Sequence, residues 1–224
     1  MSQLVCAKEC HEHLLTVARS LSPALTNAIK QNGILTLSPQ AKTPFAERLC
    51  RAVAGQQLSV KAAASIWGRV VASKPDEMDL MTHLHGVEPA VLKGCGLSGA
   101  KVKAMGAIAQ ASQFGQLNAT DLQQLSTVER TQRLTALWGI GQWTADMMNL
   151  FYFGEPDIWP EGDVTARNTL ETLTSKRRKT IRTAERFGPY RSYLALHMWR
   201  HVDATPDNTP DNTPDNTPDK SPDK

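Results

Sequence analysis

Apolar residues recur at helical spacing in one segment after another of this 224-residue chain, with short turns rich in Gly, Pro and Ser between them. Apolar positions three and four apart share one face of a helix and can pack that face against a core. Few stretches show the alternating, β-branched pattern of a strand. The pattern therefore predicts an all-α fold.

Start and stop signals mark several of these segments. Leu and Ala have helical spacing over residues 12–31. The stretch "TPFAERLCRAVAGQQLS" predicts a helix capped by Thr43, with Pro44 at its first position and its end near Gly55. Ser59 is a possible cap for the helix that follows.

Two more signals lie further along the chain. Gly94, Gly96 and Gly99 indicate a turn between two short helical segments. Ser126 and Glu129 have the spacing of a capping box, in which each residue satisfies a backbone N–H near the other. These signals divide the middle of the chain into short helices.

The last twenty residues, 205–224, repeat a unit of Thr, Pro, Asp and Asn. Proline at every fourth place excludes helix and sheet, and no apolar residue is present to form a core, so we expect disorder. Five Asp and two Lys give this tail −3 of the formal net charge of +3, so residues 1–204 carry +6. That basic surplus points mildly to nucleic acid, with ordinary solubility charge as the alternative.

Length and composition suit one large domain or two small lobes with a buried core. No apolar run approaches the ~20 residues of a membrane span, so no membrane partner is expected. The N-terminal "MSQLVCAKECHEHLL" carries charge where a signal peptide has an apolar core. We expect a cytosolic protein whose four cysteines are free thiols.

The segment "LTALWGIGQWTADMMNLF" places the turn Gly139-Ile140-Gly141 between two helical patterns. Glycine adopts backbone angles that other residues resist and lets another chain approach closely. The second helix begins after Gly141, where its first N–H groups lack helical partners and carry the positive end of the helix dipole. Such a start can bind a phosphate of a DNA backbone. An ordinary tight connection between packed helices is the alternative.

Four separated motifs together resemble the helix-hairpin-helix DNA glycosylase superfamily, and within it the DNA-3-methyladenine glycosylase II branch. The motifs are "AGQQLSVKAA", "LWGIGQWTADMM", "DIWPEGDVTARNTL" and "PYRSYLALHMWR", between residues 45 and 202. The resemblance implies a two-lobed helical domain over residues 1–204, with a cleft between the lobes. It also implies a monomer that acts on duplex DNA containing alkylated bases.

The resemblance implies that Asp163 is the catalytic carboxylate. An Asp before a helix is also a good N-cap, and the two roles are compatible because the helix start helps keep the carboxylate ionised. Cleavage of an N-glycosidic bond builds positive charge on the sugar, and a nearby anion stabilises it. Asp157 and Glu161 are nearby acids that do not match the motif position, and Asp146 is interpreted as structural.

Trp143 stands where strand-cleaving relatives place a lysine nucleophile, so the resemblance implies a monofunctional enzyme that leaves an abasic site. Trp143 is also a candidate wall of the base pocket. An alkylated purine carries positive charge, and an aromatic face attracts a cation by ~0.5–2 kcal/mol. Core packing is the alternative. Further pocket candidates, each with a core role as alternative, are Trp67, Trp138, Tyr152 and Trp159.

The resemblance places Gln56 and Gln57 at the DNA minor groove, with Gln57 at the position that fills the gap left by a flipped nucleotide. Some relatives carry an apolar wedge there, and a plain polar loop is the alternative. The other candidate DNA-binding residues are Ser59, Gly139, Ile140, Gly141, Thr144 and Arg167.

The hairpin of relatives also binds a monovalent cation, Na⁺ or K⁺, through backbone carbonyls. By position these belong to Thr135, Leu137 and Ile140. No cofactor is required for the implied reaction. His197 and His201 are four residues apart but lack an HExxH pattern, and the cysteines that hold an iron–sulfur cluster in some relatives are absent after Asp163.

Together, the motifs predict a monofunctional DNA glycosylase that flips alkylated purines of the 3-methyladenine and 7-methylguanine type out of duplex DNA. It would hydrolyse their N-glycosidic bonds as the first step of base excision repair. We expect it in the cytoplasm at the nucleoid, or in the nucleus of a eukaryote. Two alternatives remain: a sister glycosylase with another base specificity, and a non-catalytic protein that binds lesions.

Overall fold

The computed structural model describes residues 3–39 and 42–204, and the predicted disordered tail lies outside this range. The described part is helical and contains no strand, as the sequence predicts. In chain order the helices are α1 (Gln3–Arg19), α2 (Pro23–Asn32), α3 (Phe45–Gly55), α4 (Val60–Ala72), α5 (Leu80–Gly86), α6 (Pro89–Gly94), α7 (Gly99–Gln113), α8 (Ala119–Gln124), α9 (Thr127–Thr135), α10 (Gln142–Met148), the π-helix η1 (Asn149–Phe153), α11 (Val164–Leu173), α12 (Thr180–Ala184), the 3₁₀-helix η2 (Glu185–Phe187) and α13 (Arg191–Ala204). No helix in the described ranges is long and apolar enough to cross a membrane.

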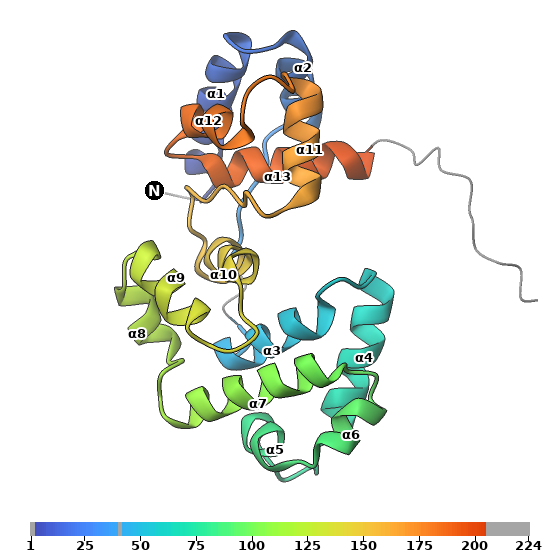
Figure 1. Cartoon of the computed structure of the whole chain (residues 1–224). Coiled ribbons are helices and arrows are strands. Elements are labelled where there is room, and N and C mark those ends of the chain that lie inside the picture. Colours follow the sequence, from blue (N-terminus) through green and yellow to red (C-terminus); the bar gives the residue numbers. More distant parts are fainter. Residues whose placement is uncertain (1–2, 40–41, 205–224) are drawn as a thin grey trace, which may run out of the picture.

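Two apolar cores divide the helices into two lobes (Figure 1). The first lobe contains α3–α9 and buries Leu49 and Ile108, among others, while the second contains α1, α2 and α11–α13 and buries Leu170 and Phe187. The segment formed by α10 and η1 lies between the lobes (Figure 1). Met148 and Tyr152 of this segment pack in the first core, and Leu150 packs in the second. This segment is therefore the helical link between the two halves.

Caps that depend only on neighbouring residues form as the sequence predicts. The Ser59 hydroxyl accepts from the Ala62 N–H at the start of α4. Ser126 and Glu129 form the predicted capping box at the start of α9. The turn predicted around Gly94–Gly99 is present, although Gly99 is already the first residue of α7.

Residues 12–31, with their helical spacing, belong to two helices, because Ser22 starts α2 by accepting from two backbone N–H groups and Pro23 takes the first helical position. One local prediction is wrong. Thr43 does not cap α3, whose N-cap is Pro44 and receives no side-chain cap hydrogen bond. The Thr43 carbonyl instead accepts from the Tyr152 hydroxyl, which comes from the link between the lobes.

The hairpin turn between α9 and α10 rests directly on α7. Gly139 has a φ of +84°, and a Cβ built at this position would lie 2.7 Å from the Ala104 Cβ. Both the left-handed backbone and the close approach exclude a larger residue. Gly139 therefore sets the height of the hairpin above α7.

Arg130 anchors α9 to the link between the lobes. Its guanidinium is buried and donates to Glu155 at 2.9 Å and to the Asn149 side chain at 3.0 Å. It also donates to the carbonyls of Leu122 and Leu125. Removal of the guanidinium would take one donor from each of these four acceptors, although the Leu122 carbonyl also accepts from the Leu125 N–H.

Two of the four cysteines, Cys50 and Cys95, are buried free thiols, as expected. Cys10 is buried in the second core. Burial raises the pKa of the Cys50 thiol well above its usual range. These thiols therefore behave as small apolar core residues.

The Arg130 network predicts a large stability effect. We expect Arg130→Ala to lower the free energy of unfolding by about 3 kcal/mol, because it removes a buried guanidinium and leaves the buried Asn149 oxygen and the half-buried Glu155 carboxylate without this donor. Chemical denaturation measures this difference. Arg133→Ala, at an exposed position of the same helix, is the control and should change stability by less than about 0.5 kcal/mol. Equal losses in the two variants would contradict the anchoring role.

Candidate active site

A cavity of about 550 Å³ opens where the two lobes meet. Three segments line it: the end of α3, the start of α10 and the start of α11. Its walls are Gln56, Gln57, Gly141, Trp143, Thr144, Gly162, Asp163, Val164 and Thr165. The volume falls in the range of ~300–1,000 Å³ that is typical of small-ligand pockets.

The Asp163 carboxylate lies in this cavity and is held by three N–H donors. As N-cap of α11, its Oδ1 accepts from the Ala166 N–H at 2.8 Å. The same oxygen accepts from Trp199 Nε1 at 3.0 Å, and Oδ2 accepts from Trp143 Nε1 at 2.9 Å. Because both oxygens have fixed donors on different elements, the carboxylate has one defined orientation.

Trp143 is the one predicted pocket aromatic that the structure brings next to Asp163. It is the second residue of α10, and 37% of its surface is exposed. A Cβ built at Gly162 would lie 3.6 Å from the Trp143 Cβ, so the turn before Asp163 passes close to the base of this side chain. The ring and the carboxylate are thus the aromatic and acidic walls of one cavity.

Trp199 is a site residue that the sequence reasoning missed. It lies on α13, half-buried, with its ring 5.7 Å from that of Phe151. The spacing of α13 predicted only packing. A buried indole N–H needs an acceptor, but nothing in the sequence identifies Asp163, 36 residues away, as that acceptor.

Gln56 and Gln57 form the rim of the cavity opposite α11. Gln56 Nε2 donates to Thr144 Oγ1 at 3.0 Å. Gln57 is exposed and has a φ of +59°, a left-handed conformation that costs a non-glycine residue on the order of 1–3 kcal/mol. Lys101, which the sequence reasoning also missed, donates to the backbone carbonyls of Ala54 and Gln56, both at 2.9 Å.

The other predicted pocket aromatics do not line this cavity, because each is held elsewhere. Trp67 is buried in the first core. Trp159 is buried in the second core and donates to Glu161 at 2.6 Å. Trp138 is 45% exposed on the hairpin, with the Lys103 ammonium 4.3 Å from its ring centre.

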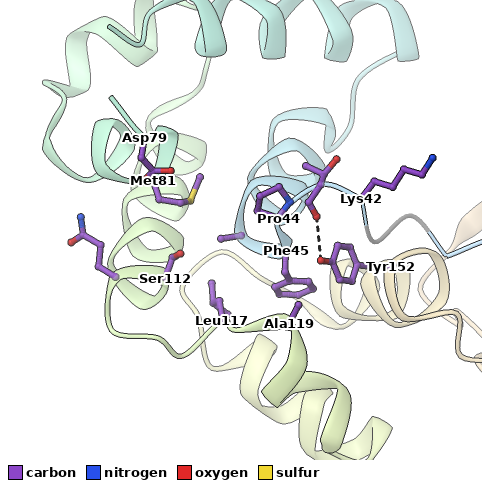
Figure 2. A pocket seen from close by; sticks show the side chains of 12 residues that line it. Lys42, Pro44, Phe45, Asp79, Met81, Ser112, Leu117, Ala119 and Tyr152 are labelled. Atoms are coloured by element: carbon purple, nitrogen blue, oxygen red, sulfur yellow. Dashed lines mark hydrogen bonds between the residues drawn. The ribbon is translucent and has the colours of Figure 1, made fainter. Parts of the chain in front are cut away.

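Tyr152 is buried in the first core and lines a different cavity, also of about 550 Å³ (Figure 2). Its hydroxyl donates to the Thr43 carbonyl, the hydrogen bond that is dashed in Figure 2, and the Phe45 ring lies beside the Tyr152 ring. This cavity is lined by residues of the first lobe, of the segment before α3 and of η1, and it shares no lining residue with the Asp163 cavity. The prediction that Tyr152 belongs to the base pocket therefore does not fit the structure.

The predicted DNA-binding residues divide by what they expose. Ser59 is exposed, and the backbone of Gly139 and Gly141 lies at the hairpin surface. The side chains of Ile140 and Thr144 are both buried, and Thr144 is also one of the walls of the Asp163 cavity. Arg167 is half-buried, and its guanidinium lies 3.4 Å from the Glu161 carbonyl. Of the predicted DNA-binding side chains, that of Ile140 is therefore covered, whereas that of Thr144 faces the Asp163 cavity.

Asp146 lies inside the hairpin's second helix and is buried. Gln142 Nε2 donates to its Oδ1 at 2.7 Å. Burial raises the pKa of the Asp146 carboxyl to about 6. Its structural interpretation agrees with this position, because the carboxyl faces Gln142 of its own helix and lies outside the walls of the Asp163 cavity.

Comparison with known proteins finds relatives that are named 3-methyladenine DNA glycosylases, whereas no protein-family model matches the chain. DNA-3-methyladenine glycosylase 1 of Schizosaccharomyces pombe is 29% identical over 170 residues, which cover 73% of this chain and 74% of that protein. DNA-3-methyladenine glycosylase 2 of Escherichia coli is 28% identical over 72% of this chain and 59% of that protein. The solved structure of the 3-methyladenine DNA glycosylase of S. pombe with abasic DNA has a TM-score of 0.73 and 27% identity, covering 86% of this chain and 95% of that one.

The buried Asp146 predicts a pH-dependent stability difference. Its folded pKa lies above the ordinary value of 3.8, so ionisation between about pH 4 and pH 6 costs folded stability. Asp146→Asn removes this cost. We expect the variant to gain on the order of 2 kcal/mol over the wild type at pH 7, and much less at pH 4.5.

Denaturation at the two pH values measures this gain. Asp203→Asn replaces an exposed carboxylate near the end of α13 and serves as control. A gain for Asp146→Asn that does not change with pH would contradict a buried, neutral-favouring carboxyl.

Proposed function

Because this chain belongs to the helix-hairpin-helix DNA glycosylase superfamily, and within it to the branch of the 3-methyladenine DNA glycosylases, we propose that it removes alkylated purines from duplex DNA. It would act as a monomeric, monofunctional hydrolase and start base excision repair, at the nucleoid or in a nucleus. The observation that carries the proposal is the Asp163 carboxylate, fixed beside Trp143 in a cavity between the lobes.

The chemistry follows from the two walls of the cavity. A 3-methyladenine or 7-methylguanine base carries positive charge, and the Trp143 face would attract it by ~0.5–2 kcal/mol. As the N-glycosidic bond breaks, the base leaves neutral and positive charge develops on the sugar. Asp163 would stabilise that charge electrostatically while water attacks the sugar carbon. The product is an abasic site.

Trp143 also supports cleavage of the base without cleavage of the strand. A strand-cleaving glycosylase needs an amine that attacks the sugar and forms a Schiff base. The indole at position 143 cannot do so, and its N–H donates to Asp163. Among the residues that line the cavity there is no lysine.

Two segments would engage the duplex. Gln57, which is exposed at the cavity rim, would enter the gap left by a flipped nucleotide. The hairpin would bind a phosphate through backbone N–H groups at the start of α10, which has no side-chain cap. The Ile140 side chain is buried, which leaves the backbone as the contact surface of the turn.

The hairpin carbonyls also fit a structural Na⁺ or K⁺. In the described residues, the carbonyl of Leu137 accepts from the Ile140 N–H at 3.1 Å, whereas those of Thr135 and Ile140 accept no backbone N–H. Neutral carbonyl oxygens are suitable ligands for a monovalent cation. Such an ion would add positive charge beside the phosphate, and the base-release chemistry does not depend on it.

The central prediction concerns Asp163. We expect Asp163→Asn to bind methylated duplex DNA nearly as well as the wild type but to release alkylated base at least about a hundredfold more slowly, because the electrostatic stabiliser is lost. Single-turnover release of methylated purines from duplex DNA measures the rate. Glu161→Gln is the matched control, because that acid lies two residues away and contacts Trp159 and Thr180.

Three outcomes are informative. Unchanged release by Asp163→Asn would refute the assignment of this carboxylate. Absence of release by the wild type with intact lesion binding would favour the non-catalytic lesion-binding alternative. Release of uracil or another unalkylated base, without release of alkylated purines, would favour a sister specificity.

A second prediction concerns the partner. Affinity for duplex DNA should fall steeply as salt rises, because each phosphate contact releases condensed counterions. Titrations at several salt concentrations between ~50 and ~200 mM measure the slope of log affinity against log salt. A flat response would argue against a duplex-DNA partner.

A further inference from the structure

The ammonium of Lys101 joins α7 to the end of α3. Its Nζ donates to the carbonyls of Ala54 and Gln56, each at 2.9 Å. Carbonyls in the last turn of a helix lack helical partners and carry the negative end of its dipole. A cation at this place therefore satisfies two acceptors and fixes the backbone on both sides of Gly55.

The residue that follows this fixed segment has an unfavourable backbone. Gln57 has a φ of +59° and an exposed side chain at the rim of the Asp163 cavity. A non-glycine residue remains in this conformation only where its surroundings determine it. Lys101 holds the backbone before Gln57, and Thr144 holds the side chain of Gln56.

Lys101 itself lies outside the walls of the cavity. It is half-buried, and burial lowers the pKa of its ammonium. The other lysine of the same helix turn, Lys103, is exposed and lies over the Trp138 ring. Lys101 thus contacts the end of α3, whereas Lys103 contacts the hairpin. Both of these segments are expected to face DNA.

We propose that Lys101 is a positioning residue for base extrusion, which holds the Gln56–Gln57 backbone so that the Gln57 side chain can fill the gap in the duplex. The proposal rests on the proposed function. Insertion of a preorganised side chain avoids the ordering cost that a mobile loop would incur on binding. Loss of the Lys101 contacts would therefore weaken extrusion and leave the chemistry at Asp163 intact.

The test is a double-mutant cycle on base release. Lys101→Met keeps most of the aliphatic stem and removes the donors, and Gln57→Ala removes the inserting side chain. We expect each variant to slow release from methylated duplex DNA on the order of tenfold, and the double variant to be no slower than the slower single variant. Release from the same strand without its complement should be unchanged, because no base pair has to open.

Two controls separate positioning from general damage. Lys101→Arg retains a cation with donors and should recover most of the activity. Lys103→Met, on the same helix, should not share the non-additive loss that Lys101→Met shows with Gln57→Ala. Fluorescence of 2-aminopurine placed opposite an abasic analogue reports unstacking on binding and needs no catalysis. It should fall in Lys101→Met and in Gln57→Ala to the same extent.

Several results would overturn the proposal. Additive losses in the double variant, or an equal loss on the unpaired strand, would show that Lys101 does not act through Gln57. Normal release and fluorescence in Gln57→Ala would remove the role of the inserting side chain while the glycosylase assignment stands. A wild type without base release would refute the proposed function, and unchanged 2-aminopurine fluorescence in Lys101→Met would then refute the positioning role independently.

Discussion

The Asp163 carboxylate is the point on which the site depends, because elements from three parts of the chain donate hydrogen bonds to it. Trp143 comes from the link between the lobes, Trp199 from the last helix, and Ala166 from the helix that Asp163 caps. A shift of one lobe against the other would break at least one of these bonds. The hydrogen bonds that orient the carboxylate therefore form together only when the two lobes keep this relative position.

The sequence predicts much of the fold because many of its signals are local. Ser59, the Ser126–Glu129 pair and Asp163 all cap helices, and a cap is decided by residues within three positions of one another. Helical periodicity likewise depends on neighbours. The apolar spacing does not reveal the break between α1 and α2, because it continues through Ser22 and Pro23.

The site is predicted less completely, because its remaining contacts are remote in sequence. Trp199 reaches Asp163 across 36 residues, and Lys101 reaches Gln56 across 45. Periodicity does not say which helix faces which. Composition alone does not distinguish Trp143, which lines the cavity, from Trp159 and Tyr152, whose side chains are buried in the two cores.

The contact between Gly139 and Ala104 has a consequence for how this chain can change. With only 2.7 Å between a built Cβ and the Ala104 methyl group, neither position can enlarge alone without lifting the hairpin. Glycine at position 104 would open space but would not relieve the positive φ at position 139. An exchange that enlarges position 139 while shrinking position 104 is therefore blocked. Substitutions at these two positions would thus not change the distance between the hairpin and α7 in small steps.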